Sequence, residues 1–402
     1  MVTLSDVLHI IPIPESDYFE ITNMISGKCF KVDYSTLEVL YTCRTKTDKE
    51  SIRERLLKIG YSINEANSFI EKMIYSNFLI SENFDEIIEF NHYSHPLFGL
   101  KQSDIHKIEN NSICIIGLPF GNGNFVDSRC KHFPKHIRNV TNNILGNKSI
   151  LTNIDTFNFK AISDFFNFDN FKTLLCSNRV IDCGDLLYTT GEDSSTYCHR
   201  VFNLYNLHIF PNKNIPISIG GDHSITYPIL KALDANYKSF DLIQFDAHSD
   251  FKSSQIMVHY QKFDILNHAN VINYCVLLKN LTNIYQIGVR EPFIAYHKKL
   301  HNISLTEVRE RQDTWMSLVT SDRPLYISID IDSFDPSIIT GTASKLPNGI
   351  FYDEALQYLK ELINHHTILG IDIVEANHKL DTTEMTTHVV RNIILHIISL
   401  LS

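Results

Sequence analysis

Short apolar runs recur along the chain from residue 112 onward, and they limit the folds that it can adopt. The runs have the length of β-strands, most end in polar or glycine-rich segments, and they occupy residues 113–116, 180–181, 215–219, 242–245, 284–287, 325–331 and 368–373. Nearly continuous apolar strands are typical of parallel sheets that helices bury on both faces. Helical stretches such as residues 351–364 lie between the runs. The sequence therefore predicts an α/β fold in which helices sandwich a parallel sheet, with ligands at the carboxyl ends of its strands.

The first eighty residues are predicted to form a small α+β module of their own, with the layout of a winged helix. Two β-rich stretches, residues 18–22 and 28–33, flank a Ser26-Gly27 turn signal, and three helices follow. Residues 1–90 carry 9 Lys+Arg and 15 Asp+Glu, hence a net charge of −6. DNA-binding winged helices are usually basic, so this charge disfavours DNA binding. The predicted domains are 1–80 and 112–402, joined by a linker over 81–111.

Capping boxes indicate where two of the three helices begin. Thr47-x-x-Glu50 opens the second helix, which stops at Gly60, and Ser62-x-x-Glu65 opens the third. Helical spacing predicts the inward faces of the first and third helices, formed by Leu37, Leu40 and Tyr41 and by Ala66, Phe69, Ile70, Met73 and Ile74.

Composition excludes several classes of protein. The formal net charge of −10 disfavours a protein that binds the phosphate backbone of a nucleic acid. No run of eighteen apolar residues is present, and the first twenty residues contain four acids and no Lys or Arg, unlike a membrane anchor or a secretory signal. The eight cysteines are scattered without a CxxC pair. We therefore expect a cytoplasmic protein without disulfides, bound neither to nucleic acid nor to membrane.

Three motifs rich in Asp and His each follow one of the apolar runs. They are Gly220-Gly-Asp-His-Ser224, Asp246-Ala-His-Ser-Asp250 and Asp330-Ile-Asp-Ser-Phe-Asp-Pro336. Residues two apart in an extended segment point to the same side. The motifs are therefore predicted to bring a set of carboxylates and imidazoles to one edge of the sheet: His223, Asp246, His248, Asp250, Asp330 and Asp332.

So many carboxylates cannot share a buried site without cations that balance their charge. Oxygen-rich ligands with two imidazoles suit Mn²⁺ before Zn²⁺, and two ions leave fewer acids uncompensated than one tetrahedral zinc. Two such ions lower the pKa of bound water to about 7, which predicts a hydrolytic centre. Taken singly, each motif also has a structural interpretation: Asp222 or Ser224 can cap a helix, and Asp335-Pro336 reads as a turn.

Residues 112–402 resemble the arginase, agmatinase and formiminoglutamase family of ureohydrolases. Beyond the three motifs, the resemblance rests on Ile116-Gly-Leu-Pro-Phe120, Pro134-Lys-His-Ile-Arg138, Asp182-Cys-Gly-Asp185, Gln286-Ile-Gly-Val-Arg290, Gly341-Thr342 and Asp372-Ile-Val-Glu-Ala-Asn377. The chain departs from the family pattern at Phe133, where Gly is usual, and at Ala343 and His378, where Pro is usual.

The resemblance implies an arginase-like three-layer fold and two Mn²⁺ ions per chain. One ion would be held by His223, Asp246, Asp250 and Asp330, and the other by Asp246, His248, Asp330 and Asp332. Asp250 would also orient the attacking hydroxide. Glu375 would pair with the guanidinium group of the substrate. His268 is the best match to the family's proton-shuttling histidine, and His259 is its rival.

Two departures bear on the substrate. The loop over residues 251–267 lacks the Ser-Gly-Asn pattern with which arginases hold the α-carboxylate, and Phe293 stands where they carry an acid that contacts the α-amino group. These departures disfavour free arginine. They favour agmatine, or an arginine whose ends are already amide bonds.

The first eighty residues are similar in layout to PqqD-like peptide-recognition domains, in which a leader peptide adds a strand to the sheet. That resemblance implies a peptide arginase, which would bind the leader of a ribosomally made precursor and convert its arginines to ornithine and urea. The alternatives are an agmatinase-type hydrolase of a small free guanidino compound and a binding protein with a structural metal site. The family resemblance also implies a homo-oligomer.

Overall fold

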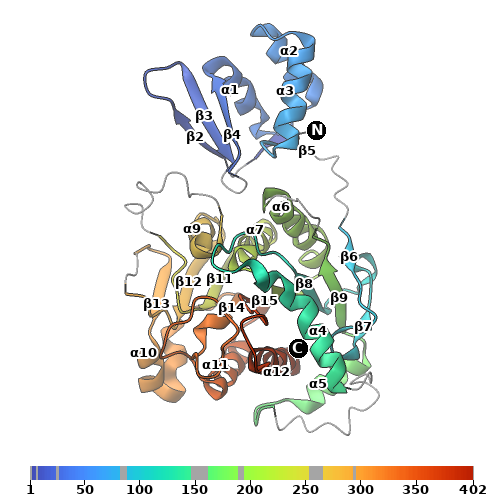
Figure 1. The fold of residues 1–402 in the computed structure, drawn as a ribbon, viewed down its shortest axis with the longest axis vertical. Helices are drawn as coiled ribbons and strands as arrows, with labels where there is room; N and C mark the ends of the chain where they lie inside the picture. The colour runs from blue at the N-terminus through green and yellow to red at the C-terminus, as the bar shows by residue number, and fades with distance from the viewer. Residues whose placement is uncertain are drawn as a thin grey trace. The chain divides into compact units, whose positions relative to one another are not determined.

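The computed structural model describes residues 2–5, 8–23, 27–81, 88–145, 162–188, 194–252, 266–292 and 296–401 (Figure 1). They divide into two compact units, the first drawn chiefly from Met1–Ile87 and the second from most of the remaining chain. No helix within these ranges is both long enough and apolar enough to cross a membrane.

A mostly parallel sheet forms the centre of the second unit. Every strand pair in it is parallel except that of β6 and β9, which is antiparallel. All seven apolar runs of the sequence form strands, as predicted. The order across the described sheet is β13 (Leu300–Ile303), β12 (Leu281–Ile287), β11 (Phe240–Phe245), β14 (Leu325–Asp330), β15 (Ile368–Val374), β10 (Ile215–Gly220), β8 (Ile113–Leu118), β9 (Val180–Leu186) and β6 (Phe90–Asn91), with β7 (Lys101–Gln102) also beside β9.

Helices cover both faces of this sheet, which confirms the predicted three-layer α/β architecture. Figure 1 shows α7 (Thr226–Asn236) and α9 (Val271–Cys275) on one side and α11 (Tyr352–His365) and α12 (Met385–Leu400) on the other. The remaining helices of this unit include α4 (Phe133–Leu145), α5 (Phe168–Cys176) and α10 (Leu305–Arg311), whose buried residues join the core beneath α11 and α12. α6 (Ser194–Leu204) precedes a short π-helix, Tyr205–Ile209.

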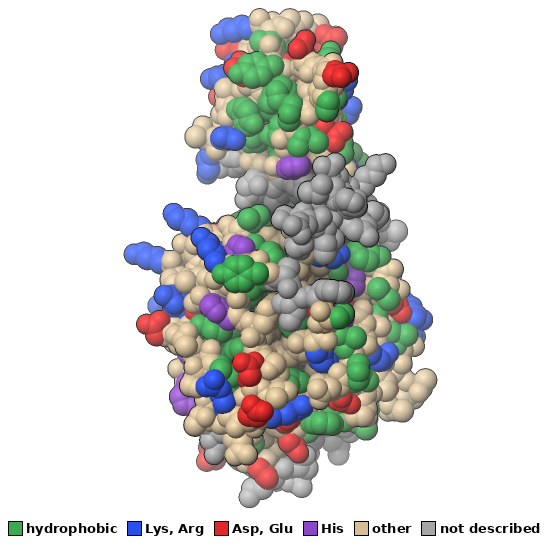
Figure 2. All heavy atoms as spheres, turned by 90° about the vertical axis from the view of Figure 1, so that its left-hand side faces the viewer, with side chains coloured by type: hydrophobic (Ala, Val, Ile, Leu, Met, Phe, Trp, Pro, Cys, Tyr) green, Lys and Arg blue, Asp and Glu red, His purple; other side chains and the backbone are tan. Residues whose placement is uncertain are grey.

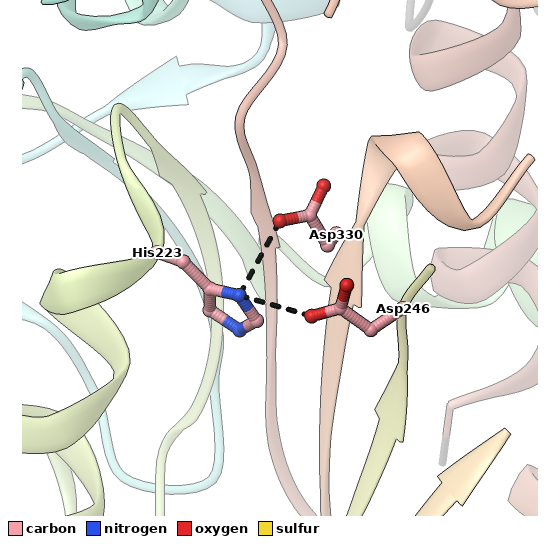
Figure 3. Close-up of side chains that lie close together, drawn as sticks. All are labelled: His223, Asp246 and Asp330. Carbon is pink, nitrogen blue, oxygen red and sulfur yellow. Dashed lines mark ion pairs between the residues drawn. The ribbon is translucent and has the colours of Figure 1, made fainter. Parts of the chain in front are cut away.

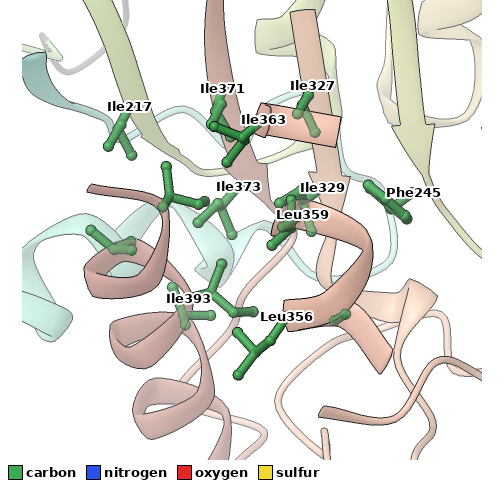
Figure 4. Close-up of a cluster of buried hydrophobic side chains, with 14 of the residues drawn as sticks. Ile217, Phe245, Ile327, Ile329, Leu356, Leu359, Ile363, Ile371, Ile373 and Ile393 are labelled. Carbon is green, nitrogen blue, oxygen red and sulfur yellow. The ribbon is translucent and has the colours of Figure 1, made fainter. Parts of the chain in front are cut away.

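The two faces of the sheet differ in chemistry. Strand residues such as Ile327 and Ile329 of β14 pack against Leu356 and Leu359 of α11 in one apolar cluster (Figure 4). Because side chains alternate along a strand, the residues between them face the other way. That opposite face is buried but polar near the middle strands, where it presents Ser218, Gln244, Gln286, Ser328 and Asp372.

The first unit contains the predicted strands and helices together with further strands. β3 (Tyr18–Asn23) and β4 (Cys29–Asp33) form an antiparallel sheet with β2 (Leu8–Pro12), and β1 (Val2–Leu4) pairs with β5 (Leu79–Ser81). The helices are α1 (Tyr34–Tyr41), α2 (Lys49–Lys58) and α3 (Ile63–Tyr75). β2 was not predicted, because it carries Pro12 within a segment bounded by Pro14, a signal that argues against a strand.

The caps and faces of these helices confirm one prediction and correct two. Ser62 and Glu65 form the expected capping box at the start of α3. Thr47 does not cap α2; Asp48 does, accepting from the backbone N–H of Ser51 at 2.8 Å. Asp48 caps the helix in place of Thr47 because a carboxylate is a better acceptor for the N–H groups of a helix N-terminus than a hydroxyl. Tyr41, predicted to face inward, is 37% exposed because it is the last residue of α1.

The predicted linker over residues 81–111 is also corrected where the structure describes it. Residues 88–111 belong to the second unit and supply β6 and β7 to the edge of the large sheet. Leu97, Phe98 and Leu100 are buried in its core. These two strands are each two residues long, too short to leave a periodic signal in the sequence.

A buried ion triad joins α4 to the end of β9. The Arg138 guanidinium donates to both oxygens of Asp182, at 3.0 and 2.7 Å, and also to Asp185. The backbone N–H of Leu97 donates to Asp182 at 2.7 Å, and the hydroxyl of Tyr93 donates to Asp185. All three charged side chains are almost fully buried. The arginine of one family-like motif therefore offsets part of the negative charge of the two acids of another inside the protein.

We predict that Arg138→Ala destabilises the fold by about 3–5 kcal/mol, because it leaves two buried carboxylates without a counter-charge. Urea unfolding monitored by circular dichroism measures the change. Arg129→Ala is the matched control: Arg129 pairs with Asp127 at the surface, and its loss is expected to cost less than about 1 kcal/mol. A stability of Arg138→Ala equal to that of the control would contradict the structural role of the triad.

Candidate metal centre and catalytic site

Four neighbouring strands deliver the predicted site residues to one edge of the sheet. β11, β14, β15 and β10 are consecutive in the sheet order and run parallel to one another. Their carboxyl ends therefore meet, as sequence reasoning expected. His223 follows β10, Asp246 follows β11, Asp330 ends β14 and Glu375 follows β15.

His223 lies at the centre of the first group of ligand atoms. Its Nδ1 atom is 3.3 Å from an oxygen of Asp246 and 3.3 Å from one of Asp330, both drawn in Figure 3. A carboxylate oxygen of Asp250 lies 2.9 Å from the same atom. His223, Asp246 and Asp330 have ligand atoms close enough together to hold one metal ion.

His248 belongs to a second group that shares one member with the first. Its Nδ1 atom is 3.0 Å from Asp332 and 3.8 Å from Asp246. Asp246, His248 and Asp332 have ligand atoms close enough for a metal ion of their own. Asp246 therefore belongs to both groups, as expected for a carboxylate shared by two ions. Asp330, which was also expected to be shared, has its ligand atoms in the first group only.

A buried hydrogen-bond chain fixes the proton of His223. The hydroxyl of Ser328 donates to Asp372 at 2.6 Å, so its oxygen is free to accept from Nε2 of His223, 3.0 Å away. Thr226 and Tyr326 also donate to Asp372. With its proton on Nε2, the imidazole presents a lone pair at Nδ1, which is buried and has no hydrogen-bond partner. A lone pair that faces three carboxylates fits a cation between them.

The charges of the cluster also indicate that a cation fits between these carboxylates. Burial, and then the nearby Asp250 and Asp332, raise the pKa of Asp246 to about 7. Burial likewise raises the pKa of Asp330 well above its ordinary value. Among the described residues, no Lys or Arg forms an ion pair with any of these carboxylates. The donor set of oxygens and imidazoles fits hard or borderline divalent cations such as Mn²⁺.

Further side chains hold the ligands in place without being ligands. Gln286 donates to Gln244, which donates to Asp246, each at 2.7 Å. Arg290 donates to six backbone carbonyls, including those of Asp332 at 2.8 Å and Leu346 at 2.9 Å, and so ties the third motif to the segment around Leu346. The arginine of the Gln286–Arg290 segment therefore organises the backbone around the site.

Glu375 and His268 lie beside the metal-ligand cluster. Glu375 is buried, accepts from the backbone N–H of His223 at 3.0 Å, and has an oxygen 3.6 Å from Nδ1 of His268. Burial lowers the pKa of His268 and raises that of Glu375. Both Asp250 and Glu375 have left-handed backbone conformations, with φ of 48° and 64°. Such conformations are strained for residues other than glycine and cluster at functional sites.

Some predicted features lie outside the described residues. They are His259, the rival to His268, the greater part of the 251–267 loop, and Phe293. Asp222 does cap a short helix, accepting from the N–H of Ser224, so the structural interpretation of that motif holds beside the functional one.

Sequence reasoning missed several buried polar residues next to the site, among them Asn124 and Ser328. The amide nitrogen of Asn124 donates to Glu375 at 2.6 Å, and Ser328 orients His223. Only their positions in the sequence could have indicated a role. Asn124 is in the loop that follows β8, and Ser328 is a polar residue inside an apolar strand.

The fold and the site together define an α/β protein with a carboxylate and histidine cluster suited to two metal ions. The chain belongs to the arginase family, whose model matches residues 111–399. This places it among the ureohydrolases, hydrolases that act on guanidino C–N bonds. Proteins of this family depend on a binuclear Mn²⁺ centre, and the His and Asp groups of this chain can hold such ions.

Similar proteins include agmatinases. The chain is 31% identical over 218 residues to an agmatinase of Blochmanniella floridana, covering 52% of this chain and 67% of that one. It is 25% identical over 341 residues to an agmatinase of Sodalis glossinidius, covering 81% and 94%. Among solved structures, the proclavaminate amidino hydrolase of Streptomyces clavuligerus has a TM-score of 0.59 at 20% identity, covering 77% of this chain and 97% of that one. The structural likeness supports the fold alone.

We predict that Asp246→Asn removes at least one of two bound Mn²⁺ ions per chain, because Asp246 is shared by both groups of ligand atoms. The loss of affinity should exceed the roughly 10- to 100-fold typical when a residue that only orients a metal ligand is lost. Metal content after dialysis, measured by plasma emission spectrometry, tests this.

The matched control is Asp335→Asn in the third motif. Its carboxylate accepts from the backbone N–H groups of Ser337 and Gly349 and belongs to neither ligand group. Asp335→Asn should keep the metal content of the unmodified chain. Equal metal content in Asp246→Asn and the control would refute the assignment of Asp246.

Proposed function

We propose that this protein hydrolyses the guanidino group of a small free guanidino compound of the agmatine class. Water adds to the guanidinium carbon and the bond to the substituted nitrogen breaks, so R–NH–C(NH₂)₂⁺ and H₂O give R–NH₃⁺ and urea. The observation that carries the proposal is a buried carboxylate, Glu375, beside the metal-ligand cluster.

Glu375 is suited to bind a cation that arrives from outside. Neutral groups, the backbone N–H of His223 and the side-chain amide of Asn124, donate to its two oxygens. In the described part of the chain its only ion-pair partner is His268, at 3.6 Å. A buried carboxylate without a permanent cation is costly, and a guanidinium with planar paired donors would relieve that cost.

The choice of the agmatine class rests on two further points. The two relatives compared above by sequence, from Blochmanniella floridana and Sodalis glossinidius, are agmatinases. In addition, Glu291, the acid after Arg290, already accepts from the backbone N–H of Ser249 at 2.8 Å. Because the Glu291 carboxylate already binds the backbone of the second motif, it is not free to bind the α-amino group of a substrate. This favours a substrate that has no α-amino group.

Each residue would have a separate part in the reaction. His223, Asp246, Asp250 and Asp330 would hold one divalent ion, and Asp246, His248, Asp330 and Asp332 the other. Such ions supply Lewis acidity and lower the pKa of water to about 7. Glu375 would orient the guanidinium, Asp250 would accept a hydrogen bond from the attacking water, and His268 would carry a proton to the leaving amine.

A peptide-bound arginine is the second candidate substrate, and the first unit favours it. The family model begins at residue 111, so Met1–Ile87, which form most of this unit, lie outside the match. Among the described strands, β2 and β4 pair only with β3, which leaves two sheet edges able to accept a peptide strand. Figure 2 shows hydrophobic side chains gathered on one face of the unit, and exposed apolar residues include Ile11 of β2 and Tyr18 of β3. Under this proposal a precursor leader would bind there and the product would be peptidyl ornithine.

We predict that the Mn²⁺-loaded full-length protein releases urea faster from agmatine than from three other substrates. These are free arginine, an arginine peptide capped at both ends, and an arginine peptide fused to a leader encoded beside the gene. A colorimetric urea assay run in parallel measures all four. Turnover confined to the leader-fused peptide would move the conclusion to the second candidate, and no urea from any of them would reject both.

We predict that Glu375→Gln lowers kcat/KM for agmatine by about 100-fold or more, because a neutral amide replaces the carboxylate that pairs with the guanidinium. Glu384→Gln is the matched control, since Glu384 follows the same strand but pairs with His136 at 2.7 Å. Its kcat/KM should stay within about twofold of the unmodified enzyme. Retention of full activity by Glu375→Gln would refute the role given to Glu375.

A further inference from the structure

The loop over residues 121–127, which follows β8, is tied to the segments that carry the site. The backbone N–H of Gly123 donates to Asp222 at 2.7 Å, and its carbonyl accepts from the N–H of His268 at 3.1 Å. A Cβ atom on Gly123 would lie 2.6 Å from the hydroxyl of Ser224, so the close approach requires glycine. The loop is therefore held at a fixed distance from both His223, which follows Asp222, and His268.

Asn124 uses both ends of its amide in this loop. Its Oδ1 atom accepts from the backbone N–H groups of Val126 and Asp127, each at 2.8 Å. Since a backbone N–H can only donate, these contacts assign oxygen to that end of the amide. The other end, Nδ2, then faces Glu375 and donates to its Oε2 atom at 2.6 Å. Asn124 is 5% exposed, so water does not compete for this contact.

The contact completes the restraint of the Glu375 carboxylate. Its Oε1 atom accepts from the N–H of His223 at 3.0 Å, while Oε2 accepts from Asn124. The backbone of Glu375 is itself anchored, because its N–H donates to Gly221 at 2.8 Å. Both groups that donate to the carboxylate are neutral. They therefore fix its plane while leaving its negative charge uncompensated.

We propose that Asn124 is a positioning residue that aims the Glu375 carboxylate at the substrate guanidinium. The inference rests on the proposed function, because it assigns Asn124 a part in binding the guanidino group. Asn124 does not touch the reacting atoms; it acts through Glu375. Loss of its Nδ2 donor frees the carboxylate to rotate, and a misdirected carboxylate weakens both binding and the alignment of the guanidinium carbon.

A structural role and a positioning role can be separated, because they use opposite ends of the same amide. Asn124→Asp keeps an oxygen acceptor for Val126 and Asp127 but replaces the donor with a second carboxylate oxygen facing Glu375. Asn124→Ala removes both ends. If Asn124 positions Glu375, Asn124→Asp lowers kcat/KM for agmatine at least as much as Asn124→Ala does, by about 10- to 100-fold or more.

The matched control lies two residues away in the same loop. Asn122→Asp makes the same chemical change at an exposed residue whose Nδ2 donates to the hydroxyl of Tyr188 at 2.7 Å. This variant should keep kcat/KM within about twofold of the unmodified protein. Metal content and melting temperature are measured on every variant. Asn124→Ser replaces Asn124→Asp if the latter does not fold, since a hydroxyl retains the turn but is too short to reach Glu375.

A second test exchanges the hydrogen-bond donor and acceptor between positions 124 and 375. In a Glu375→Gln background, the new amide can donate to the carboxylate that Asn124→Asp introduces, so adding the second substitution should cause little further loss of methylguanidine affinity. In the unmodified background, Asn124→Asp should weaken methylguanidine binding about 10-fold or more, measured by calorimetry on the Mn²⁺-loaded protein. An equal loss of affinity in both backgrounds would contradict the coupling between Asn124 and Glu375.

The outcomes distinguish this inference from the proposed function. Near-normal kcat/KM and methylguanidine affinity in Asn124→Asp would overturn the inference while leaving the proposed function intact. Binding of methylguanidine that depends on Asn124, with no urea released from any guanidino compound, would overturn the proposed function alone. An unmodified protein that neither binds methylguanidine nor releases urea overturns both.

Discussion

The mutual repulsion of buried carboxylates is the constraint on which this structure depends. Parallel strands that end side by side bring Asp246, Asp250, Asp330 and Asp332 to one edge of the sheet. Within the described residues no Lys or Arg pairs with them. Burial of so much negative charge is unfavourable unless cations occupy the space between the oxygens. The sheet therefore assembles a site whose charge and donor atoms suit metal ions.

The same protein contains a second set of buried acids, for which its own Arg138 supplies the counter-charge. Asp182 and Asp185 resemble the acids of the site in sequence, since both belong to a motif that begins directly after an apolar run. They differ in that the Arg138 guanidinium lies between them. Whether a buried acid is structural or available to a ligand therefore depends on which cation the fold supplies. A family-like motif alone does not show this difference.

Much of the fold and of the candidate site could be predicted from the sequence, because continuous apolar runs identify buried strands and the motifs at their ends identify the ligand atoms. The parts that could not be predicted depend on contacts between distant residues. β6 and β7 are strands only because β9 offers them an edge. Asn124 gains its importance from Glu375, which lies far along the chain. No local pattern in the sequence records such pairings.

The left-handed conformations of Asp250 and Glu375 cost the fold stability at two residues that the site uses. Glycine adopts this conformation without a steric penalty, whereas other residues are strained in it. Glycine at either position would relieve this strain but would remove a group that the chemistry needs. At position 375 it would also leave the backbone N–H of His223 and the amide of Asn124 without their acceptor. A screen that retained a demand for urea release would keep both acids together with their strain, whereas left-handed residues such as Lys213 and Asn348 could be exchanged for glycine without losing a site residue.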